Sequence, residues 1–258
     1  MNNPWSLECE KGIGILTFSN PPRNFLDYNA ITELGKAFDI INEKDDVKVV
    51  VVKSIMQDAF ISGADINIFR HSSNEDISRF VTTSRAIFKK IEDSSKPVIS
   101  AVEGVCLGGG CEFIMCCDIK VAGEGATFGL PEIIYGLIPG GGGIQRLSRL
   151  TNRGRALKML LTGFSVKAKE AFEYGLVDEV VESGKALSAA LKIAGRIAMQ
   201  SPLAIKYIKE RVNNGLEMNL EKAYEEDEIY FNRMIESQDS KEGMEALTQR
   251  RLPKYSGK

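Results

Sequence analysis

The sequence predicts an α/β protein with a helical C-terminal region. Two observations indicate this class: strands and helices alternate through the first half of the chain, and the last third reads as helix almost throughout. With 258 residues, of which 43% are hydrophobic, the chain is long enough to bury a substantial core. The sequence contains no fixed-period repeat and no low-complexity linker.

The first strand–helix–strand unit comes near the start of the chain. GIGILTF (12–18) and VKVVVVKS (47–54) predict strands, and the second is so apolar that we expect both of its faces to be covered. Between them Asn29 is a candidate N-cap for a helix. The helix is indicated by apolar residues at helical spacing, namely Ile31, Leu34, Phe38 and Ile41.

A second unit follows. Residues 74–94 place apolar side chains on one helical face, and KPVISAVEG (96–104) predicts a buried strand. We then expect a helix over about 109–117 and a strand over 118–123. Beyond them the sequence predicts helices with one strand among them, at 176–182. The helices are expected near 140–150, 153–162, 167–173, 184–200, 202–214 and 218–236.

A soft boundary near residue 195 divides the chain. It separates an α/β core (1–195) from a helical region (196–258) that docks back or reaches a neighbouring subunit. The net charge of −2 and dispersed basic residues argue against a nucleic-acid partner. No apolar run approaches the roughly 20 residues of a membrane span, and the first residues carry no basic and hydrophobic leader. We therefore expect a cytoplasmic protein without membrane contact.

Four of the five cysteines lie within twelve positions of one apolar segment, which makes disulfides among them geometrically awkward. We interpret them as reduced core thiols. A metal cluster is the sharper alternative, but the spacings do not match paired CxxC motifs and the single histidine, His71, lies in a distant polar stretch. We expect no metal. These cysteines are Cys106, Cys111, Cys116 and Cys117.

The segment EGVCLGGGCEFIMCCD (103–118) places three glycines and a glutamate in an apolar run. A strand that enters a helix through glycines leaves backbone N–H groups free at the helix start, where a ligand can touch the main chain. A dinucleotide fingerprint fails because Phe113 stands where its last glycine belongs. Tight helix–strand packing through glycine remains the structural alternative.

Two further segments resemble parts of a site. DAFISGADI (58–66) ends in a small-residue turn, with Gly63 and Ala64, that can present a second backbone N–H. Glu112 and Glu132 both lie among apolar residues, which raise a carboxylate's pKa toward the range useful for acid–base catalysis. Two such groups in one pocket can divide the roles of acid and base. The alternative for each glutamate alone is an exposed surface position.

With these segments in this order, the chain resembles the enoyl-CoA hydratase/isomerase (crotonase) family. The resemblance covers practically the whole chain in several ordered blocks, and the number and order of these blocks make the match specific. They are NPPRNFLDYNAITEL, FISGADI, KPVISAVEGVCLGGGCEFIMCCDI, ATFGLPEIIYGLIPGGGGIQRL, AKEAFEYGLVDEVV, KYIK and SKEGMEALTQRRLPKY. It implies a crotonase-type (ClpP/crotonase) spiral of β-β-α units with a C-terminal helical region, and a trimer or a dimer of trimers.

The resemblance also implies roles for individual residues. Ala64 and Gly109 match the two backbone donors that hold the thioester oxygen as it becomes an enolate. Glu112 matches the residue that activates water, and Glu132 the residue that protonates the α-carbon; many isomerases keep only the second. The substrate- and CoA-binding set is Arg23, Gly63, Asp65, Ile66, Tyr135, Gly140 and Arg250, the last from a helix that can complete a neighbouring pocket. Solvated charge is the alternative for both arginines.

Three departures from the family pattern concern the acyl group. Tyr135 stands where an aliphatic residue is frequent, Leu130 replaces a frequent glutamine, and FLDY replaces ALNAL. We predict an enoyl-CoA hydratase that needs no cofactor beyond the coenzyme A of its substrate. An acyl-CoA double-bond isomerase or thioester hydrolase is the alternative, and a non-catalytic acyl-CoA-binding subunit is disfavoured because both glutamates are present.

Overall fold

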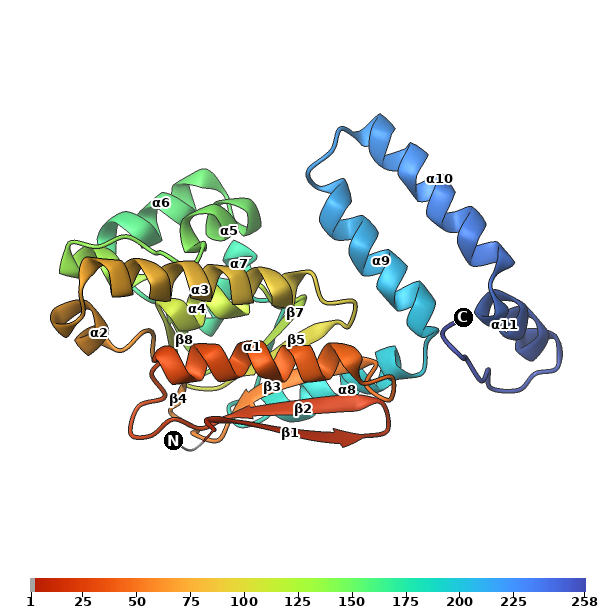
Figure 1. Cartoon of the computed structure of the whole chain (residues 1–258), viewed down its shortest axis with the longest axis horizontal. Helices are drawn as coiled ribbons and strands as arrows, with labels where there is room; N and C mark the ends of the chain where they lie inside the picture. Colours follow the sequence, from red (N-terminus) through yellow and green to blue (C-terminus); the bar gives the residue numbers. More distant parts are fainter. Residues whose placement is uncertain (1–2) are drawn as a thin grey trace.

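The computed structural model describes residues 3–258 and confirms an α/β core followed by a helical arm (Figure 1). Its main sheet has six strands in the order β1-β2-β3-β5-β7-β10, parallel except for the antiparallel pair β1–β2. These strands are β1 (Trp5–Glu10), β2 (Ile13–Phe18), β3 (Val49–Ser54), β5 (Val98–Val102), β7 (Ile119–Gly123) and β10 (Glu179–Val181).

A second, smaller sheet runs in the order β4-β6-β8-β9. Each of its first three strands follows a strand of the main sheet and precedes a helical segment, so the chain repeats a β-β-α unit, as the resemblance implies. The strands are β4 (Ala59–Ile61), β6 (Val105–Leu107), β8 (Thr127–Gly129) and β9 (Val166–Lys167). Because β4, β6 and β8 pair side by side, the segments that follow them meet at one edge.

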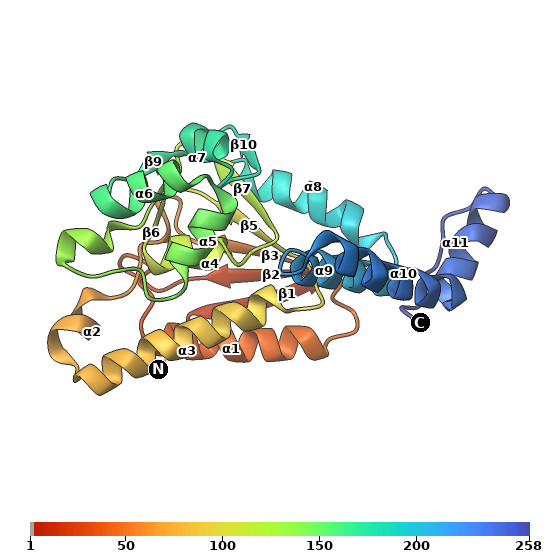
Figure 2. The same cartoon turned by 90° about the horizontal axis from the view of Figure 1, so that it is seen from above.

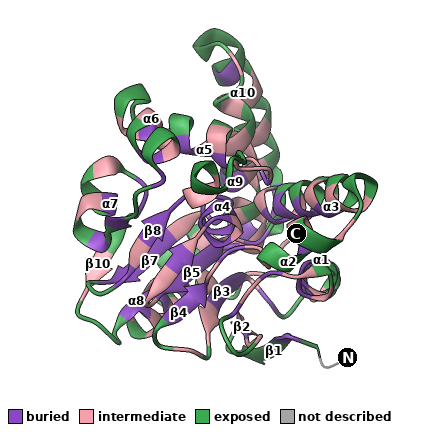
Figure 3. Ribbon diagram, turned by 90° about the vertical axis from the view of Figure 1, so that its left-hand side faces the viewer, coloured by how far each residue is buried: buried purple, intermediate pink, exposed green. Residues whose placement is uncertain are grey.

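Helices cover both faces of the main sheet, and Figure 3 shows its strands as largely buried. On one side α8 (Ala186–Ala198) packs Ala190 and Ala194 against Val51 and Ile99. On the other lie α1 (Tyr28–Glu43), α3 (Asn74–Glu92) and α4 (Gly109–Ile114). The four consecutive valines of β3 are all buried, which confirms that this strand is covered on both faces.

The remaining elements connect this core to the arm. They are α2 (Ile66–His71), the 3-10 helix η1 (Pro131–Tyr135), α5 (Gly143–Leu150), α6 (Arg153–Thr162) and α7 (Ala168–Tyr174). The arm comprises α9 (Pro202–Gly215), α10 (Leu220–Glu236) and α11 (Gln238–Thr248), and both views show it extending away from the core (Figures 1 and 2). Residue 195, where we expected the boundary, falls inside α8.

Several local predictions differ from the structure. The N-cap of α1 is Asp27 and not Asn29, because the Asp27 carboxylate accepts a hydrogen bond from the Ala30 amide at 2.7 Å. Helix α4 ends at Ile114 and not at 117. The sequence interpretation also missed α2, α11, β1 and the short strands β6, β8 and β9 of the second sheet, whereas β4 lies in the strand region expected within 58–66. Of the helices in residues 3–258, none has the length and hydropathy that a membrane span requires.

Candidate active site

The three glycines between β6 and α4 have separate structural reasons. Gly108 has φ 49°, in the left-handed region that glycine adopts without strain. A Cβ on Gly110 would lie 2.3 Å from the carbonyl oxygen of Ile61, so close packing excludes a side chain there. A Cβ on Gly109 would lie 3.7 Å from the amide nitrogen of Ala64. Packing therefore explains Gly110, whereas Gly109 stands opposite a second backbone amide.

The amides of Ala64 and Gly109 are both available to a ligand. Leu26 holds the segment after β4: its N–H donates to the Gly63 carbonyl at 2.8 Å, and its carbonyl accepts from the Asp65 amide at 3.0 Å. Leu26 thus bonds to the residues on either side of Ala64, and the Ala64 amide donates no backbone hydrogen bond within residues 3–258. Gly109 is the first residue of α4, so its N–H has no partner in the helix.

Glu112 lies in the first turn of α4, and its carboxylate is held by the glycine loop (residues 140–143) that leads into α5. The side chain is only 5% exposed, and Oε1 accepts a hydrogen bond from the Gly143 amide at 2.8 Å. Burial raises the pKa of Glu112, while main-chain N–H groups of the loop and the positive charge of Arg146 oppose this rise. The Glu112 carboxylate is therefore held in one orientation and its negative charge is partly stabilised, which suits a general base.

Glu132 is held differently from Glu112, because one of its carboxylate oxygens accepts no hydrogen bond within residues 3–258. It lies in η1, a 3-10 helix that the sequence did not predict. A Cβ on Gly108 would lie 3.2 Å from Glu132 Oε1, so this carboxylate lies against the start of α4. Its Oε2 is buried and has no hydrogen-bond partner within residues 3–258. Burial, followed by the nearby Glu112 charge, raises the pKa of Glu132 to about 7.

A cavity of about 530 Å³ joins these groups. Its wall includes both candidate amides, both glutamates and four other predicted residues: Gly63, Ile66, Tyr135 and Gly140. Apolar and aromatic side chains form much of the remainder, which suits a largely apolar ligand. The Tyr135 side chain is 60% exposed, so it lies at the rim.

Three predicted residues do not line this cavity. Arg23 is exposed in the loop before α1, and Asp65 caps α2 by accepting a hydrogen bond from the Asn67 amide at 2.9 Å. Arg250 follows α11, at the far end of the arm from α2 (Figure 1). Within this single chain, Arg250 and the cavity are therefore far apart.

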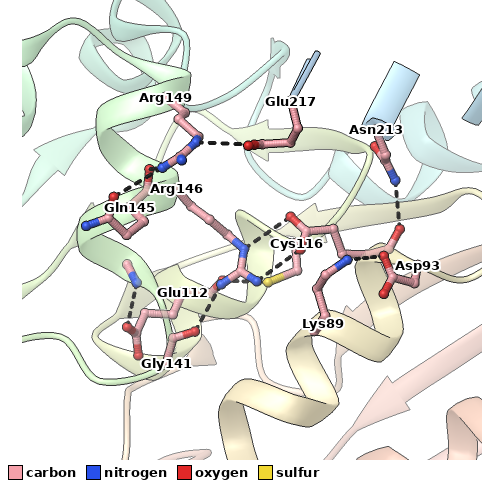
Figure 4. Close-up of polar contacts among 12 residues, drawn as sticks. Lys89, Asp93, Glu112, Cys116, Gly141, Gln145, Arg146, Arg149, Asn213 and Glu217 are labelled. Carbon is pink, nitrogen blue, oxygen red and sulfur yellow. Dashed lines mark hydrogen bonds and ion pairs between the residues drawn. The ribbon is translucent and has the colours of Figure 1, made fainter. Parts of the chain in front are cut away.

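The sequence interpretation missed three residues around Glu112. Gly143 supplies its hydrogen-bond donor, Arg146 donates to the Gly141 carbonyl at 3.0 Å, and Arg85 donates to the Gly140 carbonyl at 2.9 Å. Figure 4 shows Arg146 and Glu112 on the two sides of Gly141. Glycines at 141–143 were a visible signal for the loop, but no local pattern indicates which arginines reach it.

The clustered cysteines are not part of the cavity wall. Cys106, Cys111, Cys116 and Cys117 are buried free thiols, which confirms the prediction of reduced core cysteines. Burial raises the pKa of the Cys117 thiol to about 12, and so disfavours the thiolate. Residues 3–258 contain no group of three or more His, Cys, Asp or Glu side chains arranged to hold a metal ion.

Comparison with known proteins identifies the family. The sequence profile described as enoyl-CoA hydratase/isomerase matches residues 8–258. The chain belongs to the enoyl-CoA hydratase/isomerase family.

Relatives within this family match the chain over nearly its whole length. A crotonyl-CoA hydratase of Syntrophomonas wolfei is 36% identical, over 98% of this chain and 97% of its own. A short-chain-enoyl-CoA hydratase of Clostridium acetobutylicum is 34% identical, over 95% and 94%. The crystal structure of an enoyl-CoA hydratase from Bacillus anthracis superposes with a TM-score of 0.95 at 32% identity, over 99% of this chain and 100% of that one. The crotonase-type fold is thereby confirmed.

Proposed function

We propose that this protein is an enoyl-CoA hydratase, which adds water across the double bond of a trans-2-enoyl-CoA to give a 3-hydroxyacyl-CoA. The observation that carries the proposal is that two differently held carboxylates, Glu112 and Glu132, lie in one largely apolar cavity beside two backbone amides that have no partner among residues 3–258. The names of the Syntrophomonas and Clostridium relatives support the same reaction. Hydration needs two carboxylates in different protonation states, which their different surroundings favour.

The amides of Ala64 and Gly109 bind the thioester oxygen in this proposal. As water attacks the β-carbon, the electrons of the double bond move toward the thioester carbonyl and its oxygen becomes negative. A main-chain donor aimed at such an oxygen lowers the barrier by about 3 to 4 kcal/mol. This role is supported because, within residues 3–258, neither N–H group has a hydrogen-bond partner and both residues line the same cavity.

Glu112 and Glu132 move the protons. Ionised Glu112 takes a proton from water while the water oxygen bonds to the β-carbon. Protonated Glu132 gives its proton to the α-carbon of the enolate, so the sum of the two steps is one added water. The glutamates then exchange protons with solvent to restore their starting states. A pKa near 7 allows Glu132 to be protonated in a neutral medium, as a general acid must be.

The substrate's coenzyme A extends beyond the cavity in this proposal. Gly63 and Tyr135 contact the acyl thioester, and Tyr135 lies where the acyl group meets solvent. The backbone at Gly140 helps to shape the site of the attacking water. Arg23, outside the cavity, contacts the phosphates of coenzyme A, and Asp65 and Ile66 form the turn around its adenine. No metal or redox cofactor takes part, because the thioester and the two amides supply the electrophilic activation.

We further propose a homotrimer, or a dimer of trimers, in the cytoplasm. The arm supports assembly because its apolar side chains are exposed in the single chain: Leu216 is 81% exposed, and Tyr224 and Phe231 are exposed with it. A second cavity, of about 1420 Å³, lies between the arm and the core, and the exposed apolar side chains of Ile208, Val212 and Leu216 in its lining offer a surface that a neighbouring subunit can cover. In such an assembly Arg250 reaches a neighbouring subunit's coenzyme A site.

The test is a panel of acyl-CoA thioesters incubated with the purified protein and read by mass spectrometry. A hydratase adds the mass of one water to a short or medium trans-2-enoyl-CoA. Movement of the double bond without a mass change, or release of free coenzyme A, would instead assign the protein to the isomerases or hydrolases of its family. Glu112→Gln and Glu132→Gln should each lower turnover by at least about 100-fold with the fold intact.

A further inference from the structure

The glycine loop between η1 and α5 is packed between Glu112 and Arg146. A Cβ on Gly141 would lie 2.6 Å from Glu112 Oε2, and one on Gly142 would lie 2.2 Å from an Arg146 terminal nitrogen. The Gly143 amide donates to Glu112 at 2.8 Å. A shift of this loop therefore changes the position of the Glu112 carboxylate directly.

Arg146 holds the loop from the side opposite Glu112. One terminal nitrogen donates to the Gly141 carbonyl at 3.0 Å (Figure 4). The other two guanidinium nitrogens bind both carboxylate oxygens of Glu92, at 3.2 and 3.1 Å. The pair is partly buried, with the Arg146 side chain 15% exposed, and a two-pronged arginine–carboxylate contact fixes orientation as well as distance.

Glu92 is itself fixed at the end of α3. Its main-chain carbonyl accepts a hydrogen bond from the side chain of Asn213, in α9, at 2.9 Å. The chain of contacts thus runs from the arm through Glu92, Arg146 and Gly141 to the loop that holds Glu112. Figure 4 shows Asn213, Arg146, Gly141 and Glu112 in this one network.

We propose that Arg146 and Glu92 are positioning residues: by fixing the Gly141 carbonyl they keep the Gly143 amide on Glu112, and so aim the carboxylate that activates water. The inference rests on the proposed function, since it assigns Glu112 the task of a general base. Neither residue lines the candidate active-site cavity, so neither touches substrate in this arrangement.

The charged groups around Glu112 determine how its titration should respond. Arg146 faces it from α5, Arg85 from α3 and Glu132 from η1, and the buried thiols of Cys111 and Cys116 have raised pKa values that keep them neutral. Both arginines favour the ionised form of Glu112. Loss of the Arg146 charge, or of the Gly143 hydrogen bond, therefore raises the pKa of Glu112. A base must be ionised, so the acid limb of activity moves to higher pH.

The experiment compares Arg146→Gln, Arg146→Lys and Glu92→Gln with a matched control, Arg149→Gln. Arg149 lies on the same helix, but its exposed pair with Glu217, at 3.7 Å, does not touch the loop. We expect kcat for hydration to fall about 10- to 100-fold in Arg146→Gln, with KM changed less than about threefold, because misplaced catalytic groups cost rates of this order. The acid limb should rise in pH in Arg146→Gln, Arg146→Lys should recover part of kcat, and the control should match wild type.

A readout without substrate separates this inference from the proposed function. In the ligand-free protein, hydrogen–deuterium exchange of a peptide covering residues 139–146 should be faster in Arg146→Gln and Glu92→Gln than in the control. If wild-type protein hydrates no enoyl-CoA but this exchange difference is present, the proposed function fails while the loop's support stands. Unchanged loop exchange and an unmoved acid limb in folded Arg146→Gln and Glu92→Gln would overturn the positioning role.

Discussion

The free energy of unfolding should fall as pH rises through the titration of Glu132, because burial favours the protonated form of this side chain in the folded state. Burial raises its pKa to about 7, against an ordinary value of 4.5 in the unfolded chain. Between these values the folded state binds more protons than the unfolded state, so the free energy of unfolding falls with pH. The stabilisation from the protonated carboxyl is fully present below about pH 4.5 and is lost as pH rises through about 7.

The magnitude follows from the size of the shift. A difference of about 2.5 pKa units corresponds to about 3 kcal/mol, of which about 2 to 3 kcal/mol falls between about pH 5 and pH 8. Glu132→Gln removes this titration while it keeps a similar side-chain volume. The variant should therefore gain stability relative to wild type as pH increases, even though it loses hydratase activity.

Denaturant unfolding of wild type and Glu132→Gln, at a series of pH values, measures this difference. Glu124→Gln, which removes an exposed glutamate, is the matched control. The difference in unfolding free energy between Glu132→Gln and wild type should grow by about 2 to 3 kcal/mol from about pH 5 to pH 8. A difference that stays constant over this range would refute the assignment of Glu132 as a buried acid.

Three other predictions concern the amides, the base and the assembly. Gly109→Ala should fold, because the close contact of its Cβ, at 3.3 Å, is with the end of the Leu26 side chain, which can shift slightly. It should lose about 100-fold in kcat/KM because the methyl group crowds the amide pair. Gly110→Ala should instead lower the melting temperature, since its Cβ would lie 2.3 Å from the Ile61 carbonyl oxygen. Kinetics and thermal melts of both variants distinguish these effects, and wild-type kinetics in folded Gly109→Ala would contradict the first. The hydration rate of wild type should fall at acid pH as Glu112 is protonated and at alkaline pH above about 7 as Glu132 ionises, and a flat profile would contradict this assignment. Light scattering at micromolar concentration should give a trimer or hexamer, and a monomer would contradict the role proposed for the arm.

The sequence predicted those parts of the site whose residue types are unusual for their surroundings. Two glutamates in apolar runs and a glycine triplet stand out because burying a carboxylate, or omitting a side chain, is costly unless a site uses it. The strand over 49–54 was equally readable, because only a doubly covered strand tolerates four valines in succession.

Other features had no readable local pattern. Strands β4, β6 and β8 are three residues each, too short for a periodic signal, yet their pairing brings Ala64, Gly109 and Glu132 to one edge. The sequence interpretation named Asn29 as the N-cap of α1, and only the hydrogen bond from the Ala30 amide to the Asp27 carboxylate identifies Asp27 as the cap. Arg146 binds Glu92, which lies 54 positions earlier in the chain, and a single sequence contains no pattern that predicts a charge pair at that separation.

The most direct test of the hydratase assignment is a paired assay in deuterated water. Loss of the conjugated enoyl-CoA absorbance reports hydration, and mass spectrometry reports deuterium at the α-carbon of the product. Exchange of the α-proton is followed separately in a saturated acyl-CoA, whose α-protons can leave through the enolate. Wild type should give a 3-hydroxyacyl-CoA that carries deuterium at that carbon. Glu112→Gln should lose hydration to a greater extent than residual α-proton exchange, because Glu132 remains. Equal loss of both activities in folded Glu112→Gln, or a wild-type protein that exchanges the α-proton but never adds water, would contradict the division of roles between the two carboxylates.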